Sequence, residues 1–222
     1  DCFEKVRYHL LKVPQYGEGD DSIITPAKRG TKIHKELEKY YNDELYIPDF
    51  CPVFEIEEER AFWRVASELD QVRDLVIFSE GELVKQDGDL RVKGILDLVL
   101  EDYEGNIVVV DYKFPGKKWN DERFADYVTK QAYFYMWMLE PRCIRLEYWV
   151  CPLTNANDFK IWTVDYNHED IQRNLQQWKA VDAQIRSAVN FPFLFQASPS
   201  YSACKWCNWR HECPVTFVPV KK

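Results

Sequence analysis

Strand-like runs separated by tight turns occupy the middle of the chain. Val76–Gln86 and Leu90–Glu101 are joined through Asp87-Gly88-Asp89, which is a strong signal for a hairpin turn. A second turn, Asp102–Asn106, leads into the β-branched run Ile107–Val110, which is typical of a buried central strand. Because consecutive strands with short turns pair with their neighbours, the sequence predicts an antiparallel meander of three strands.

Helical patterns flank this meander on both sides. Pro26 opens a helix that runs to about Asn42, with an apolar stripe at helical spacing. Further helices are expected at about 1–13, 56–69, 120–139 and 168–189, and further strands at 144–152 and 159–164. Helices before, between and after the strands predict a mixed α/β domain with a central β-sheet.

Composition limits the classes of protein to consider. Of the 222 residues, 46% are hydrophobic, which is enough for a packed core. The formal net charge of −8 argues, taken alone, against a basic surface for nucleic acid. The longest obvious apolar run, 132–139, is far shorter than the ~18 residues of a membrane span, so no membrane association is expected. Seven cysteines are an odd number, which favours a reducing, cytoplasmic compartment over a full set of disulfides.

Two carboxylates and a lysine form the first chemical pattern. Asp111 directly follows the β-branched run, and Asp111 and Lys113 share a face because residues i and i+2 of a strand point the same way. The preceding turn brings the strand of Asp97 alongside. Two carboxylates suit Mg²⁺ or Mn²⁺, which stabilise charge on a phosphodiester and activate an attacking water that the lysine can orient or deprotonate. A solvated strand end is the alternative, since the acid-x-Lys pattern also occurs at Asp158-Phe159-Lys160.

Three more polar side chains lie on predicted helices. His34 is at the margin of an apolar stripe, about 100° from Ile33, where a lone histidine is usually structural. Gln131 and Tyr135 are four residues apart and project together. Tyr135 fits the helix's core stripe equally well, whereas a buried Gln131 needs partners for both its carbonyl and its amide.

The order of these motifs is recognisable. Gly-Thr-x-x-His, Gly-x-x-Asp, Asp-x-Lys and Gln-x-x-x-Tyr follow one another between Gly30 and Tyr135, an order that resembles the RecB-like branch of the PD-(D/E)XK nuclease superfamily. Leu96 stands where the superfamily name has Pro. The resemblance implies a restriction-endonuclease-like fold, in which helices flank a mixed central β-sheet.

The resemblance also implies roles for the site residues. His34, Asp97 and Asp111 would bind Mn²⁺ or Mg²⁺, two ions in all, together with the main-chain carbonyl of Tyr112, and Lys113 would assist the attacking water. Gln131 and Tyr135 would contact the nucleic acid near the scissile phosphate. We add Lys117 and Lys118 to this contact surface, because the basic residues Lys113, Lys117, Lys118, Arg123 and Lys130 lie close together in the sequence. Phosphate binding depends on where basic residues lie, so the acidic balance does not exclude DNA.

A cysteine cluster lies near the C-terminus. Cys204-x2-Cys207-x5-Cys213 supplies three thiolates, which need a fourth ligand to close a zinc site or a cubane iron–sulfur cluster. His211 would complete a zinc site, whereas Cys2 would complete an all-thiolate cluster, and the spacing alone favours neither.

The resemblance favours the cluster. Some RecB-like nucleases, including CRISPR-associated exonucleases and AddB-type helicase–nucleases, carry a 4Fe–4S cluster that is bound by one cysteine before the core and three after it. The implied ligands are Cys2, Cys204, Cys207 and Cys213, so that the C-terminal segment closes onto the N-terminus. Phe3 replaces the usual Pro after the first of them. The remaining cysteines fit no ligand spacing and are expected to be buried thiols: Cys51, Cys143 and Cys151.

These observations predict three segments and one principal function. Residues 1–26 would carry the first cluster cysteine, 27–189 the nuclease core and 190–222 the rest of the cluster. The predicted function is a metal-dependent DNA exonuclease acting on single strands or duplex ends, with helicase, recombination or CRISPR-adaptation proteins as partners. Two alternatives are a nucleic-acid-binding or adaptor protein that no longer cuts, and a zinc-stabilised interaction module. The presence of all four motifs speaks against the first alternative.

Overall fold

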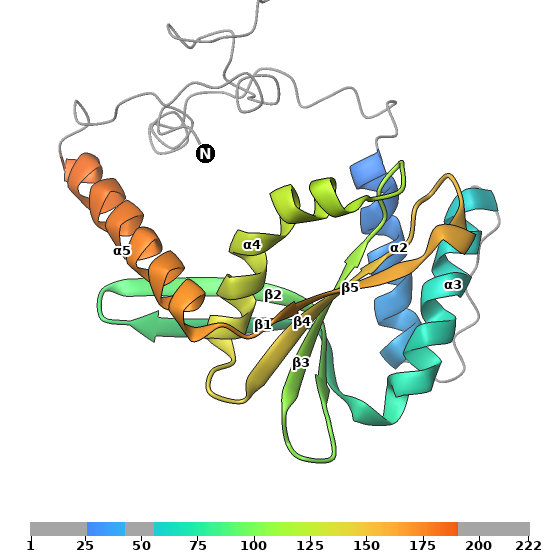
Figure 1. Ribbon diagram of the computed structural model, residues 1–222, viewed down its shortest axis with the longest axis horizontal. Helices are drawn as coiled ribbons and strands as arrows, with labels where there is room; N and C mark the ends of the chain where they lie inside the picture. Colours follow the sequence, from blue (N-terminus) through green and yellow to red (C-terminus); the bar gives the residue numbers. More distant parts are fainter. Residues whose placement is uncertain (1–25, 43–55, 191–222) are drawn as a thin grey trace, which may run out of the picture. The chain divides into compact units, whose positions relative to one another are not determined.

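A five-stranded mixed sheet is the centre of the protein (Figure 1). The structure is a computed structural model that describes residues 26–42 and 56–190. The strands lie in the order of the sequence: β1 (Val76–Asp87), β2 (Leu90–Glu101), β3 (Ile107–Lys113), β4 (Cys143–Val150) and β5 (Lys160–Asp165). Neighbours are antiparallel except for β3 and β4, which are parallel. The predicted α/β class and the antiparallel meander are therefore confirmed.

The helices begin and end close to the predicted residues. They are α2 (Pro26–Asn42), α3 (Ile56–Val72), α4 (Asp121–Met138) and α5 (His168–Asn190), with short 3-10 turns at Arg73–Leu75 and Ala156–Asp158. The parallel pair β3 and β4 needs a crossover connection, and α4 provides it. The helix predicted at 1–13 lies outside the described residues.

The chain divides into two compact units. One unit is Ile24–Gln177, which holds all five strands. The other combines Asp1–Ile23 with Trp178–Lys222, of which the structure describes only residues 178–190, the C-terminal part of α5. The site described below lies wholly within the first of these units.

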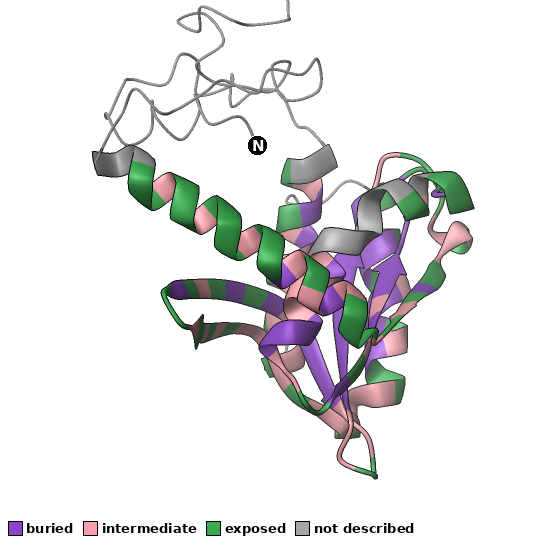
Figure 2. Cartoon of the chain, turned by 60° about the vertical axis from the view of Figure 1, so that its left-hand side comes forward, coloured by how far each residue is buried: buried purple, intermediate pink, exposed green. Residues whose placement is uncertain are grey.

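Helices α2 and α3 cover one face of the sheet. Their apolar stripes, from Ile33 and Leu37 of α2 and Phe62 and Val65 of α3, are fully buried (Figure 2). They pack against inward-facing strand residues, which are Leu98, Leu100, Val108, Val110, Tyr112 and Trp149. A buried ion pair joins the two helices, because Arg29 Nε donates to Glu58 Oε1 at 2.7 Å.

Helix α4 covers the other face. Tyr148 of β4 stands in register with Asp111 of β3, and its ring contacts Phe124 of α4 with centroids 6.2 Å apart. Trp119, just before α4, contacts the same tyrosine. Asp111 therefore lies on the face that α4 covers, whereas the next residue, Tyr112, belongs to the core beneath α2 and α3.

Two of the three cysteines expected to be ordinary thiols lie within the described residues. Cys143 and Cys151 are free and buried, and burial raises the pKa of each thiol to about 12. The burial that the sequence predicts for these two cysteines is therefore confirmed, and thiols in such an environment are unreactive. Cys51 and the proposed cluster ligands lie outside the described residues. Within the two described ranges, no helix combines the length and hydropathy that crossing a bilayer requires.

Strand β4 offers a direct test of the core. Leu146 is fully buried, whereas Ile144, two residues before it, is 37% exposed. Leu146→Ala should lower the free energy of unfolding by about 2–5 kcal/mol, because it removes packed methyl groups and leaves a cavity. Ile144→Ala is the matched control, and it should lower the free energy of unfolding by less than about half as much as Leu146→Ala. Denaturant unfolding curves check this, and equal losses would contradict the burial assigned to Leu146.

Candidate active site

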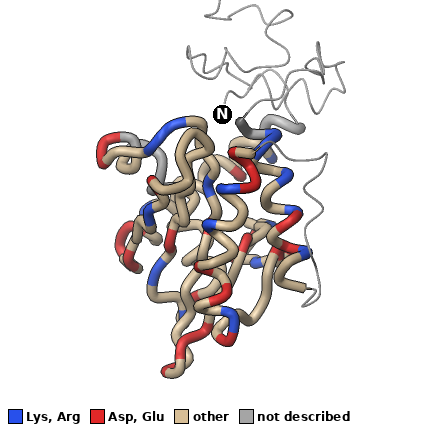
Figure 3. Tube along the Cα trace, turned by 90° about the vertical axis from the view of Figure 1, so that its right-hand side faces the viewer, with Lys and Arg blue, Asp and Glu red and all other residues tan. Residues whose placement is uncertain are grey.

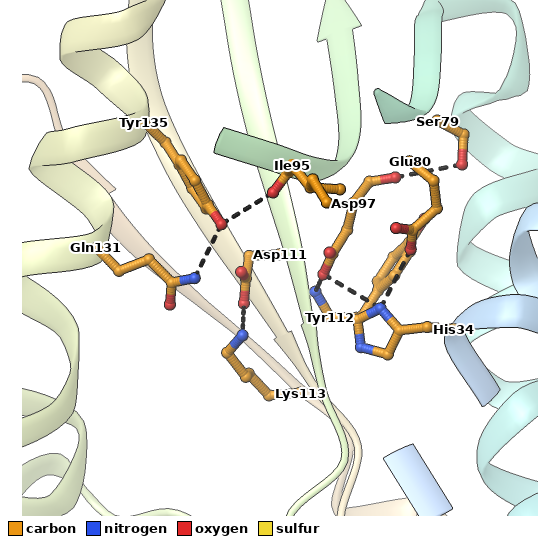
Figure 4. Close-up of polar contacts among 10 residues, drawn as sticks. All are labelled: His34, Ser79, Glu80, Ile95, Asp97, Asp111, Tyr112, Lys113, Gln131 and Tyr135. Carbon is orange, nitrogen blue, oxygen red and sulfur yellow. Dashed lines mark hydrogen bonds and ion pairs between the residues drawn. The ribbon is translucent and has the colours of Figure 1, made fainter. Parts of the chain in front are cut away.

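The site begins where two neighbouring strands stop pairing. The register of β2 and β3 runs as far as Leu98 opposite Val110, and the next residues along the two strands are Asp97 and Asp111. Beyond this point β2 pairs with β1 alone. The amide of Tyr112 therefore has no main-chain partner on β2, and it donates instead to the side chain of Asp97, at 2.7 Å from its Oδ2 (Figure 4). We call the point beyond Leu98 and Val110, where β2 and β3 separate, the fork. At the fork, a carboxylate thus takes the place of a strand carbonyl.

Asp111 and Lys113 form an ion pair on the α4 face of β3. The Asp111 side chain is 2% exposed, and Lys113 Nζ contacts its Oδ2. The carbonyl of Lys113 accepts a hydrogen bond from the Cys151 amide at 2.9 Å, so β3 stays anchored on its β4 side while it separates from β2. The Asp-x-Lys motif is therefore held on a strand that is fixed along one edge only.

A histidine and a second acid reach Asp97 from two other elements. His34 of α2 places its Nδ1 at 3.6 Å from Asp97 Oδ2 and at 3.3 Å from Oε1 of Glu80 on β1. One ligand atom from each of these three residues lies within 4.8 Å of the other two. Asp111, predicted from the sequence as a ligand with His34 and Asp97, is outside this group and pairs with Lys113 instead.

Glu80 is the site residue that the sequence analysis missed. In the β1–β2 hairpin, Ser79 pairs with Leu98 and Gly81 with Leu96, so Glu80 and Asp97 lie between these two pairs on neighbouring strands. The predicted turn at Asp87-Gly88-Asp89 sets the register that brings Glu80 near Asp97, but the approach of His34 from α2 has no local signal in the sequence.

Burial and crowded charge shift the pKa values of the site. Burial, followed by the charge of Asp111, raises the pKa of Asp97 to about 7. Burial also raises the pKa of Asp111, although the Lys113 ammonium opposes this shift. Burial disfavours the protonated form of His34, but the hydrogen bond to Glu80 and the charge of Asp97 outweigh it, so that the His34 pKa is raised. The site therefore gathers more negative charge than its own cations balance.

Gln131 and Tyr135 meet at the edge of the same site. Gln131 Nε2 donates to the Tyr135 hydroxyl at 3.1 Å, and that hydroxyl donates to the carbonyl of Ile95 at 2.9 Å. Gly94 makes this contact possible, because a Cβ there would lie 2.8 Å from Met138 Sδ and 3.4 Å from the Tyr135 ring. The glycine of Gly-x-x-Asp thus lets α4 approach β2 closely enough to reach the strand of Asp97.

The basic residues predicted to bind nucleic acid are only partly described. Lys117 and Lys118 are exposed, and Lys118 pairs with Asp158 at 2.9 Å. The side chains of Arg123 and Lys130 lie outside the described residues. Along the part of the trace that is coloured by charge, basic and acidic residues are interspersed (Figure 3). The net charge of the chain therefore says little about the charge at the site.

Comparisons with known proteins show which family and which solved structures the chain resembles. The family model described as the PD-(D/E)XK nuclease superfamily matches residues 5–214. The crystal structure named "Putative exonuclease" from Eubacterium rectale superposes with a TM-score of 0.56 at 10% identity, covering 99% of this chain and 84% of that chain. The crystal structure of SSO0001 gives a TM-score of 0.45 at 14% identity, covering 97% of this chain and 95% of that one. No curated protein matches the chain. At 10% identity the first likeness supports the fold alone.

The raised pKa of Asp97 predicts a pH-dependent effect of Asp97→Asn. The native pKa of about 7 lies above the ordinary 3.8, so the wild type loses stability as pH rises between these values and a buried carboxyl must ionise. Asn has no charge to bury and still offers an oxygen to the Tyr112 amide. In EDTA, Asp97→Asn should raise the melting temperature by a few degrees at about pH 8, and by less at about pH 5. A lower melting temperature at the higher pH would contradict the assigned pKa.

Proposed function

The chain belongs to the PD-(D/E)XK nuclease superfamily, and on this premise we propose that it is a divalent-metal-dependent deoxyribonuclease, an exonuclease acting on single-stranded DNA or duplex ends. The observation that carries the proposal is the fork between β2 and β3, where Asp97, Asp111 and Lys113 are gathered beside His34. Their carboxylate and imidazole groups can bind a divalent metal, and the ammonium can orient an attacking water, which together suit hydrolysis of a phosphodiester.

The residues at the fork fit a divalent cation. Asp97 and Asp111 offer hard oxygen ligands, His34 offers a nitrogen, and the carbonyl of Tyr112 is a fourth candidate donor. Two buried carboxylates at adjacent strand positions are costly unless a cation offsets them. Mn²⁺ or Mg²⁺ bound there, as one or two ions, would offset charge developing on the phosphate and lower the pKa of an attacking water. The imidazole nitrogen favours Mn²⁺ over Mg²⁺.

Lys113 acts on the attacking water or on the phosphate oxygens. Its ammonium is held against Asp111 on the α4 face, and its side chain is 19% exposed, so it reaches both the carboxylate and solvent. As an ammonium, a lysine in this position can orient the water by donating a hydrogen bond to it, and as the neutral amine it can accept the water's proton. We assign the catalytic roles to Asp97, Asp111 and Lys113.

The DNA strand would lie between α4 and the fork. Tyr135 and Gln131 already form a chain of hydrogen bonds to the Ile95 carbonyl, so their polar groups are held in place before substrate arrives. Lys117 and Lys118, in the loop between β3 and α4, would contact phosphates further along the strand.

Lys113→Ala tests the catalytic assignment. Removing the ammonium should reduce hydrolysis of labelled DNA by at least about 100-fold while the protein still folds. Lys160→Ala is the matched control, because Lys160 is the last residue of the chain's other Asp-x-Lys tripeptide. Unlike Lys113, it is exposed, and its ammonium lies over the ring of Trp162. Assays use single-stranded, duplex and circular DNA with Mn²⁺, Mg²⁺ or EDTA. Cleavage retained by Lys113→Ala would exclude the assignment, whereas DNA binding without cleavage by the wild type would favour the non-cutting alternative.

We also propose a structural 4Fe–4S cluster bound by Cys2, Cys204, Cys207 and Cys213. All four residues lie outside the described part of the chain, so the proposal is supported by their spacing and by the resemblance that the motifs carry. Four thiolates are the ligand set of such a cluster, and it would link the two ends of the chain across the nuclease core.

Metal analysis tests the cluster. Protein purified without oxygen should be brown and contain about four iron and four sulfide per chain, and Cys207→Ser should lose both. Cys143→Ser is the control, because Cys143 is a free buried thiol and should leave the cluster unchanged. A colourless wild type with one zinc per chain would instead assign a zinc site that His211 completes.

A further inference from the structure

Glu80 stands at the fork without a role in the predicted site. We propose that Glu80 is a metal ligand, so that His34, Glu80 and Asp97 together bind one divalent transition-metal ion before DNA is present. The inference deepens the proposed nuclease function and rests on it, since this ion would serve the same site. Asp111, held by Lys113, stays outside this first set of ligands.

His34 and Glu80 form a hydrogen bond that is long for a charged pair, and the distances at the site also fit metal coordination. A charge-assisted hydrogen bond between a ring nitrogen and a carboxylate is about 2.7–2.9 Å long. His34 Nδ1 is 3.3 Å from Glu80 and 3.6 Å from Asp97. Two ligands at about 2.2 Å from an ion and at right angles to each other stand about 3.1 Å apart. The separation of His34 Nδ1 from each carboxylate oxygen is therefore close to that of neighbouring corners of one coordination shell, and all three donor atoms lie within 4.8 Å of one another.

The hairpin register brings two acids close together. Glu80 and Asp97 lie between the pairs Ser79–Leu98 and Gly81–Leu96, and the left-handed φ of 48° at Glu80 takes its side chain out of the regular strand alternation. Like charges that approach each other from neighbouring strands destabilise a sheet, and both carboxylates approach the same His34 nitrogen. Their side chains are only 19% and 13% exposed, so water screens the repulsion weakly. A cation between them would convert this repulsion into attraction, and His34 enters from α2 as the third donor (Figure 4).

Tyr112 adds an independent observation beside the three donors. Its hydroxyl is buried and has no hydrogen-bond partner among the described residues, although buried donors are nearly always satisfied. Its ring lies 5.7 Å from that of His34, and Figure 4 shows it on the side of Glu80. A hydroxyl in this place can donate to a water or a carboxylate oxygen in the shell of a bound ion, as outer-shell residues of metal sites do.

The chemistry of the three donors selects the kind of ion. One imidazole nitrogen and two carboxylates suit Mn²⁺, whereas Mg²⁺ prefers oxygen ligands and retains several waters. A thiolate cluster elsewhere in the chain competes poorly for Mn²⁺, which is a hard ion. Mn²⁺ alone is therefore a suitable probe, and no nucleic acid is needed.

The variant Glu80→Gln distinguishes two roles of Glu80, that of a metal ligand and that of a mere hydrogen-bond acceptor for His34. Gln keeps an oxygen that can accept a hydrogen bond from His34, but it lacks the charge and donor strength of a carboxylate. The matched control is Glu82→Gln, because Glu82 lies on the same strand, is exposed and pairs with Lys93. Mn²⁺ affinity is measured on the full chain by calorimetry and by electron paramagnetic resonance of the free ion. Circular dichroism and thermal melts show that each variant folds.

We expect Glu80→Gln to weaken Mn²⁺ binding by about 10–100-fold and Glu82→Gln to leave it unchanged. His34→Ala serves as the reference for losing one ligand. Wild-type affinity in Glu80→Gln, or equal weakening in both variants, would overturn the inference, because the charge of Glu80 would then have no local role. Cleavage is assayed separately: if Mn²⁺ binds through Glu80 but no DNA is cut, the proposed function fails while the metal site stands.

Discussion

The rest of the site depends on the separation of β2 from β3. Their pairing ends at Leu98 and Val110, and the amide of Tyr112 would be left unpaired within a buried sheet if Asp97 did not accept it. That single 2.7 Å hydrogen bond holds the carboxylate at the fork. Because β3 remains paired with β4, the opening is confined to one side. The gap between β2 and β3 is bordered by two strands that are each paired with another neighbour. Such a gap is more rigid than one bordered by loops.

At the fork, acidic side chains lie close together in a largely buried environment. Asp97 and Asp111 lie at adjacent positions on neighbouring strands, and Glu80 lies near Asp97 on β1. The described cationic groups that meet them are few: Lys113 pairs with Asp111, and His34 lies between the other two acids. Burial raises the pKa values of both aspartates, and the charge of Asp111 adds to the shift at Asp97 while the charge of Glu80 adds to that at Asp111. The ionised site is therefore stabilised by a cation bound there.

Local signals made most of the fold predictable, whereas the site was predictable only in part. Turn residues at 87–89, the proline at 26 and the β-branched run at 107–110 mark element boundaries within the chain itself. Gln131 and Tyr135 meet because four residues make about one helical turn. Glu80 is different, because its contact with His34 spans 46 residues and depends on hairpin register and on the position of α2. Strand alternation also groups Glu80 with Glu82, but the left-handed φ of 48° at Glu80 breaks that alternation.

The three residues of the Asp-x-Lys motif show how tightly the site is tied to the core. Asp111 and Lys113 face α4, whereas Tyr112 between them is buried with Trp149 beneath α2 and α3. A slip of one residue in β3 would move both charged groups into that core and the aromatic ring into the site. The packing of Tyr112 therefore fixes which face the charges occupy, while its amide fixes Asp97. Substitutions of Tyr112 that keep its volume should preserve both effects, whereas a small side chain at this position would loosen the core and the site together.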